Sequence, residues 1–227
     1  MLRRLDLRGD RLGPLADLQS ALPRPNSSDA DGSDGPLEAV RSIISDVRVR
    51  GDEAIREFTQ FFDGATPPAL EVAPSEMVAA LGRIDPTVRN ALEVAVEAIT
   101  RHHEGQVRDS HTTEDAGLLV RSVSRPVERA GCYVPGGRAA YPSTVLMTAV
   151  PARVAGVDKV VVCVPPGPDG SIADVTLAAA AIANVDAVYA VGGAQAVAAM
   201  AFGTKSIPPV DVIVGPGNIY VALAKRE

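Results

Sequence analysis

The feature that most constrains the fold is a regular alternation of valine-rich runs and alanine-rich segments in the second half of the chain. Residues 159–164 (KVVVCV), 187–191 (AVYAV) and 210–214 (VDVIV) have the composition of strands, whereas residues 173–184 and 194–202 have that of helices. Strands that are apolar on both faces and recur about every 25 residues, with helices between them, are typical of a parallel sheet. The second half therefore predicts an α/β fold.

Neighbouring segments extend this pattern. Residues 118–123 and 129–134 are also predicted strands, and Ser143 is expected to cap a helix that runs to about Ala155. Residues 218–226 predict a last helix, but no C-cap residue follows it. We therefore expect a Rossmann-like parallel sheet with flanking helices, in a chain that is cut within its last helix.

The first half is predicted to be mainly helical. Asp85 and Pro86 provide an N-cap and a first-turn proline for a long helix. Further apolar residues recur at helical spacing, namely Val40, Ile43, Ile44, Val47, Ile55, Phe58 and Phe62. We expect three regions: an N-terminal segment with a mobile polar loop (1–36), a helical part of a first domain (37–129), and the Rossmann-like domain (130–227).

Charge and apolar patterning exclude several classes of partner. The 227 residues include 22 Lys and Arg against 28 Asp and Glu, for a net charge of −6, and contain no basic block. We therefore expect neither a nucleic-acid nor a membrane partner. The N-terminus alternates charged residues with leucine, and charges and proline interrupt the apolar stretch 143–166. A cytoplasmic protein is the expectation.

The cysteines and histidines do not form a metal-binding pattern. Cys132 and Cys163 have no CxxC spacing, so two reduced thiols are expected, and Cys132 as a nucleophile is the less favoured alternative. His102 and His103 are adjacent on a predicted helix and point in different directions, and His111 stands apart. The sequence therefore predicts no metal site.

Three glycine-containing turns follow predicted strands. They are residues 131–137 (GCYVPGG), 191–195 (VGGAQ) and 214–218 (VGPGN), and they present Tyr133, Gln195 and Asn218. Open parallel sheets bind ligands at the carboxyl ends of their strands, beside helix N-termini suited to phosphates. A nucleotide cofactor is therefore the expected ligand, although no GxGxxG motif follows a strand and the Gly192-Gly193 pair alone is a weak signal.

Each of the three residues also has a structural explanation. Tyr133 could be a core ring with a paired hydroxyl, Gln195 a water-facing residue of a first helical turn, and Asn218 an N-cap. Their recurrence at the same position after successive strands favours a shared site.

Several longer motifs resemble those of histidinol dehydrogenases, in order and in approximate spacing. These are residues 46–55 (DVRVRGDEAI), 133–147 (YVPGGRAAYPSTVLM), 151–156 (PARVAG), 191–196 (VGGAQA), 201–204 (AFGT) and 214–218 (VGPGN). The resemblance begins near residue 37, and the first 36 residues match only loosely. It implies NAD-dependent oxidation of L-histidinol through an aldehyde to L-histidine, the last step of histidine biosynthesis, by a homodimer with zinc. It also implies that Tyr133, Gln195 and Asn218 contact NAD.

The same resemblance places the zinc ligands and a catalytic Glu-His pair in later sequence of the family. No catalytic or metal-binding residue is therefore assigned to this chain, and we expect it to be inactive alone. Two other functions stay open: a sister zinc- and NAD-dependent dehydrogenase that acts on another small alcohol, and a noncatalytic nucleotide-binding module.

Overall fold

The computed structural model describes residues 35–136 and 139–227. The chain divides into two units, Met1–Gly35 and Pro36–Glu227, of which the second is a compact unit. The N-terminal segment and polar loop expected in residues 1–36 lie almost entirely outside the described residues. The two domains expected on either side of residue 130 both fall within the second unit.

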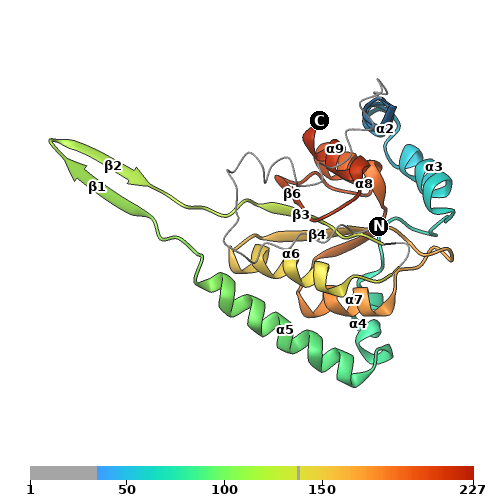
Figure 1. The fold of residues 1–227 in the computed structure, drawn as a ribbon, viewed down its shortest axis with the longest axis horizontal. Coiled ribbons are helices and arrows are strands. Elements are labelled where there is room, and N and C mark those ends of the chain that lie inside the picture. Colours follow the sequence, from blue (N-terminus) through green and yellow to red (C-terminus); the bar gives the residue numbers. More distant parts are fainter. Residues whose placement is uncertain (1–34, 137–138) are drawn as a thin grey trace, which may run out of the picture. The chain divides into compact units, whose positions relative to one another are not determined.

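The described elements alternate as the sequence predicts (Figure 1). The helices are α2 (Gly35–Arg50), α3 (Asp52–Asp63), α4 (Pro74–Arg83), α5 (Pro86–Glu104), α6 (Pro142–Val154), α7 (Asp174–Ile182), α8 (Gly193–Phe202) and α9 (Ile219–Arg226). The strands are β1 (His111–Asp115), β2 (Leu118–Ser122), β3 (Arg129–Tyr133), β4 (Lys159–Val164), β5 (Ala187–Ala190) and β6 (Val212–Val214).

Four of these strands form a parallel sheet in the order β5-β4-β3-β6. The chain proceeds from β3 outward through β4 to β5, and then returns to place β6 on the other side of β3. The strand order therefore reverses between β3 and β6. Such a reversal leaves a crevice outside the carboxyl ends of the strands, where α/β proteins bind ligands.

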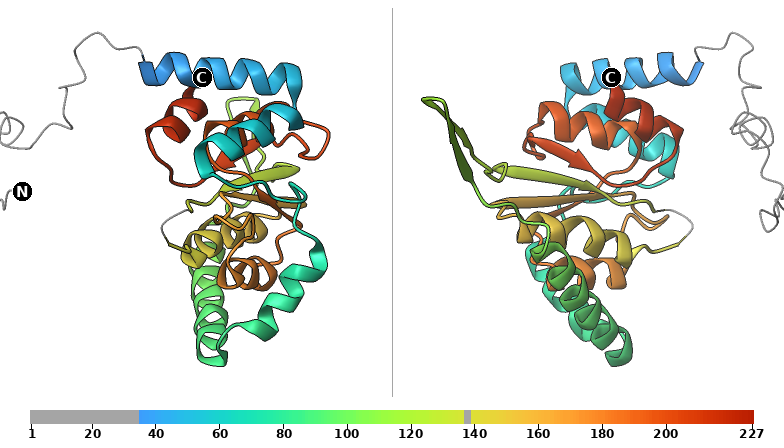
Figure 2. Two further views of the ribbon diagram at one scale, coloured as in Figure 1. Left: turned by 90° about the vertical axis from the view of Figure 1, so that its right-hand side faces the viewer. Right: turned by 60° about the vertical axis from the view of Figure 1, so that its left-hand side comes forward.

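Helices cover both faces of this sheet (Figure 2). Along β4, Val160, Val162 and Val164 belong to one hydrophobic core, which α6 and α7 complete. Val161 and Cys163 belong to a second core on the opposite face, which α2 and α8 complete. Burial on both faces explains why β4 is a continuous apolar run and not an alternating one.

The structure confirms the strand predicted at residues 118–123 as β2, but the sequence predicts neither β1 nor the hairpin that the two strands form. The two strands pair antiparallel around Ala116 and Gly117, both with positive φ, and extend away from the sheet (Figure 1). All ten strand residues are exposed. Because none of them is buried, β1 carries no apolar periodicity that could identify it as a strand.

Helix starts agree with the sequence except at α6. Asp85 caps α5, since its carboxylate accepts a hydrogen bond of 2.7 Å from the N–H of Thr87. The prediction that Ser143 caps α6 is wrong, because the helix begins at Pro142 and Tyr141 occupies the cap position. Proline at a first helical position loses no hydrogen bond, so it can start a helix without a side-chain cap. Across residues 35–136 and 139–227, no helix combines the length and apolarity that crossing a membrane requires.

Candidate functional site

The carboxyl ends of β3, β5 and β6 meet at one edge of the sheet, around a cavity of about 600 Å³. A cavity of this size is within the usual range for small-molecule sites. The structure brings Tyr133, Gln195 and Asn218 together in its wall. The described lining consists of Ile43, Phe62, Asp63, Tyr133, Pro135, Gly136, Pro165, Gly193, Ala194, Gln195, Pro216, Gly217, Asn218 and Tyr220.

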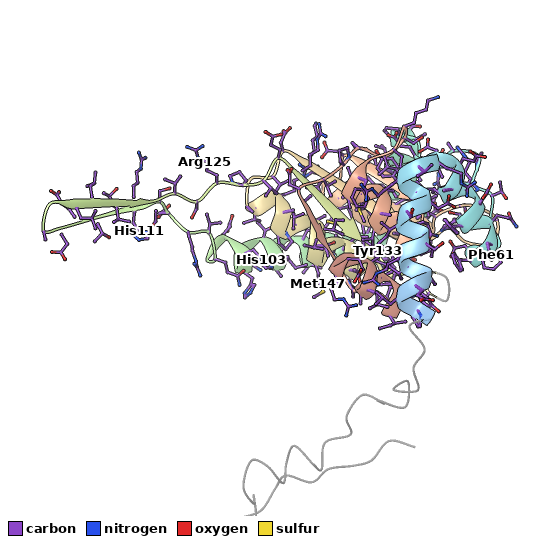
Figure 3. The ribbon with its side chains drawn as sticks, turned by 90° about the horizontal axis from the view of Figure 1, so that it is seen from above. Phe61, His103, His111, Arg125, Tyr133 and Met147 are labelled. Atoms are coloured by element: carbon purple, nitrogen blue, oxygen red, sulfur yellow. The ribbon has the colours of Figure 1, made fainter. Side chains whose placement is uncertain are left out.

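Tyr133 is the last residue of β3, and its ring is packed within the body of the unit, unlike His111 on the hairpin (Figure 3). Its phenol oxygen accepts a hydrogen bond of 3.1 Å from the backbone N–H of Gly193. Burial, and to a lesser extent the charge of Asp63, raises the pKa of the phenol above its ordinary value. Tyr133 is therefore both the core ring with a paired oxygen and a neutral hydroxyl in the cavity wall, able to donate its proton.

Gln195 is buried in the first turn of α8, with only 1% of its surface exposed. The water-facing alternative for this residue is therefore wrong. Among the described residues, neither Oε1 nor Nε2 of its carboxamide has a hydrogen-bond partner. An unpaired buried polar group costs about 1–3 kcal/mol, so a ligand that pairs with this amide would recover that cost.

The backbone conformation at position 193, two residues before Gln195, favours glycine. The φ of Gly193 is +64°, which residues with a side chain rarely adopt, and a Cβ there would collide with Oε1 of Gln195. At the preceding residue, a Cβ on Gly192 would lie 2.5 Å from Cγ of Pro165 at the end of β4. The glycine pair therefore permits the close approach of the α8 N-terminus, the end of β4 and the buried amide.

Asn218 is the N-cap of α9, as its structural explanation proposed. Its Oδ1 accepts a hydrogen bond of 3.1 Å from the N–H of Val221. The cap uses only the oxygen, so the amide Nδ2 is the group that Asn218 can offer to a ligand. The first turns of α8 and α9 both border the cavity, and helix N-termini carry a partial positive charge that favours phosphate groups.

The cavity also contains residues that the sequence did not assign to it. Ile43 of α2, with Phe62 and Asp63 of α3, contributes a wall from the helical first half. Asp63 is the only charged side chain in the described lining. Its Oδ2 is buried and has no described hydrogen-bond partner, and burial raises the pKa of the carboxyl group. No local sequence signal marks this residue, since an aspartate before a glycine is common at a helix end.

Neither cysteine belongs to the described lining of the cavity. Both are buried and free, in cores on opposite faces of the sheet. Burial raises the pKa of the Cys132 thiol to about 11 and also raises that of Cys163. A raised pKa keeps the thiol protonated and so disfavours a nucleophilic role for Cys132. Within the described ranges, His, Cys, Asp and Glu form no group of three or more that could hold a metal ion.

These features define a class of protein: a Rossmann-like α/β protein whose ligand pocket lies where the strand order reverses. Comparison with known proteins then identifies the family. Residues 27–227 match the family model described as histidinol dehydrogenase, and the chain belongs to this family.

Individual relatives agree with that assignment. The histidinol dehydrogenase of Dehalococcoides mccartyi is 52% identical over 191 residues, which are 84% of this chain and 44% of that protein. That of Parasynechococcus marenigrum is 49% identical over 218 residues, 96% of this chain and 49% of that protein. The crystal structure of histidinol dehydrogenase from Elizabethkingia anophelis superimposes with a TM-score of 0.85 at 32% identity, covering 94% of this chain and 49% of that one. The chain thus spans about half the length of these relatives.

Proposed function

We propose that this chain forms the NAD-binding part of an L-histidinol dehydrogenase, which oxidises L-histidinol through an aldehyde to L-histidine. The cofactor lies in the cavity at the ends of β3, β5 and β6. The observation that carries this proposal is the carboxamide of Gln195, which is buried in the cavity wall with both polar atoms unpaired. Such an amide can pair with a ligand that both donates and accepts hydrogen bonds.

The other lining residues fit the remaining parts of a dinucleotide. The first turns of α8 and α9 offer backbone N–H groups to the two phosphates. Close packing of the glycine turns supports this geometry: a Cβ on Gly215 would collide with the carbonyl oxygen of Tyr133. The turn that carries Asn218 is therefore held against the end of β3. The apolar rings of Pro135 and Pro165 provide rigid surface for a base or for the nicotinamide.

When bound, NAD supplies the hydride acceptor for alcohol oxidation, and this chain's residues hold it in place. Tyr133 has a raised pKa, so it stays neutral and donates a hydrogen bond without adding negative charge. Gln195 fixes the orientation of the ligand, because its own position is set by a buried helix. The proline and glycine residues of the cavity lining exclude water from the part of the ligand that they contact.

The zinc site and the acid/base pair belong, in this proposal, to the half of the relatives that the chain does not match. The described residues do not fit a zinc ion, because they contain no suitable group of ligands. A homodimer and the substrate L-histidinol are likewise proposed for the whole protein, on the basis of the family.

The two alternative functions are less well supported. Identities of 52% and 49% to relatives named histidinol dehydrogenase favour that substrate over another small alcohol. A noncatalytic nucleotide-binding module would have the same cavity, but it would not act on the family's substrate. A substrate screen on a protein extended to the length of the relatives would separate these possibilities.

Isothermal titration calorimetry with NAD⁺ tests the proposal. Replacing Gln195 by Ala should weaken binding about tenfold or more, because the loss of hydrogen bonds worth ~1.4 kcal/mol changes Kd by a factor of ten. Glu97→Gln on the exposed surface of α5 is the matched control and should bind as the unmodified chain does. Equal affinities of the unmodified chain and Gln195→Ala would overturn the assignment of the cavity.

A further inference from the structure

Asp63 differs from the other carboxylates of the described fold that have perturbed pKa values. Asp46 pairs with Arg50, Asp174 pairs with Arg83, and hydrogen bonds from Ser206 more than offset the burial of Asp52, so the pKa of each is lowered. Asp63 has the opposite shift, since burial raises its pKa. Asp63 belongs to the cavity lining, and its Oδ2 is buried and has no described donor.

The position of Asp63 connects it to the proposed cofactor pocket. It is the last residue of α3, and α3 packs against α8, whose first turn carries Gln195. Its charge is close enough to raise the pKa of Tyr133, so the carboxylate and the phenol share one environment. No Lys or Arg belongs to the described lining, so no cationic side chain there neutralises the carboxylate. A ligand that satisfies Asp63 must bring a hydrogen-bond donor and must not bring a second negative charge to this point.

The strand that usually carries a carboxylate for the ribose of a dinucleotide does not carry one in this sheet. In dinucleotide-binding sheets, an acidic residue about 20 residues after the first glycine-rich turn binds the ribose 2′-hydroxyl. Here the strand that follows β3 is β4, which ends at Val164 and is followed by Pro165 and Pro166, and none of these three residues has a carboxylate. Asp63 provides a carboxylate to the same cavity from a different element.

We propose that Asp63 determines cofactor specificity: its carboxylate accepts a hydrogen bond from the 2′-hydroxyl of the adenosine ribose, and it excludes a cofactor with a 2′-phosphate. This inference rests on the proposed function, because it requires NAD in the cavity. The hydroxyl supplies the donor that Oδ2 lacks. A 2′-phosphate would instead place a dianion beside a carboxylate with no cationic side chain in the described lining, and like charges in a partly desolvated site repel strongly.

Equilibrium binding of NAD⁺ and NADP⁺ to the chain tests the proposal. Asp63→Asn keeps the size of the side chain but removes the charge, and Asp63→Ser also leaves space for a phosphate. The unmodified chain should prefer NAD⁺. Asp63→Asn should reduce that preference about tenfold, through weaker NAD⁺ binding and improved NADP⁺ binding, and Asp63→Ser should reduce it further. Glu53→Gln removes one negative charge from the exposed surface of the same helix and should leave the preference unchanged.

Two analogues identify the group that Asp63 contacts. 2′-deoxy-NAD⁺ should bind to the unmodified chain about as weakly as NAD⁺ binds to Asp63→Asn, and should lose little further affinity in that variant. Nicotinamide hypoxanthine dinucleotide, which lacks the adenine amino group, should remain sensitive to Asp63→Asn. If it becomes insensitive, the adenine amino group is the partner and the assignment to the ribose is overturned.

The outcomes separate this inference from the proposed function. If neither NAD⁺ nor NADP⁺ binds to the unmodified chain, the cavity is not a dinucleotide site and both proposals are overturned. If NAD⁺ binds and Gln195→Ala weakens it, but Asp63→Asn leaves the NAD⁺/NADP⁺ ratio unchanged, only the role of Asp63 is overturned. Thermal melting of Asp63→Asn checks folding, and an unfolded variant is replaced in this comparison by Asp63→Ser and 2′-deoxy-NAD⁺.

Discussion

The phenol oxygen of Tyr133 and the backbone N–H of Gly193 are joined by a hydrogen bond of 3.1 Å that connects the ends of β3 and β5. These strands are not neighbours in the sheet, since β4 lies between them. The bond therefore crosses the edge of the sheet and fixes the α8 N-terminus relative to β3. It also commits the oxygen of Tyr133 as an acceptor, which leaves its proton for a ligand.

Tyr133→Phe should weaken both the fold and the site. The N–H of Gly193 loses its partner, so we expect a loss of about 1 kcal/mol in the free energy of unfolding. NAD⁺ affinity should fall as well, because the hydroxyl donor is removed. Chemical denaturation and calorimetric titration measure the two effects, and unchanged NAD⁺ affinity would show that the hydroxyl only supports the fold.

Gly193→Ala should be more damaging than its small size suggests. The added Cβ would meet Oε1 of Gln195 at a backbone φ of +64°, so we expect a loss of at least about 1 kcal/mol and weaker NAD⁺ binding. Gly82→Ala on α4 is the control, since nothing lies within 4 Å of its Cβ position. That change should stabilise the helix by roughly 0.5–1 kcal/mol. Equal melting temperatures for the two variants would contradict this interpretation.

Asp63→Asn should become more stable relative to the unmodified chain as the pH rises. Burial raises the pKa of Asp63 in the folded state above its ordinary value, so the folded protein binds this proton more tightly than the unfolded chain does. Stability is therefore lost as the pH rises from the unfolded-state pKa through the folded-state pKa, and it stays lost above that. The asparagine does not titrate and avoids this loss. Urea denaturation at several pH values measures the difference, and destabilisation of Asp63→Asn at neutral pH would instead indicate a structural role.

The 227-residue chain should form no NADH above background when it is mixed with NAD⁺, zinc and L-histidinol. The proposal assigns the zinc ligands and the acid/base pair to sequence that this chain does not match. The measurement is absorbance of NADH at steady state, with an active histidinol dehydrogenase of full family length as a positive control. Sustained turnover by the chain would contradict this division of the site.

The parallel sheet was predictable because β4 and its neighbours are buried on both faces and carry that burial as unbroken apolar runs. Strand β2 of the hairpin was predictable from its apolar residues, but β1 was not, because its five residues are all exposed and leave no apolar pattern. The burial of Gln195 has a signal in the composition of its helix. Every residue from Ala194 to Met200 is buried, and a helix that is apolar all round is expected to be enclosed.

The role of Asp63 in the cavity wall depends on tertiary packing. Nothing near position 63 distinguishes it from an ordinary aspartate at a helix end. It reaches the cavity because α3 packs against α8, which is about 130 positions later in the chain. Local patterns therefore identified the residues at strand ends, but not the wall that a separate helix provides.

The described cavity wall begins with Ile43 in α2 and ends with Tyr220 in α9, so it joins residues from near both ends of the second unit. During synthesis, the pocket cannot close until the last helix has been made and has docked. A dinucleotide would then recognise only chains whose first and last described helices are both in place, and its binding would shift the folding equilibrium toward that completed state. Cofactor affinity is in this sense a direct assay of how much of the unit has assembled.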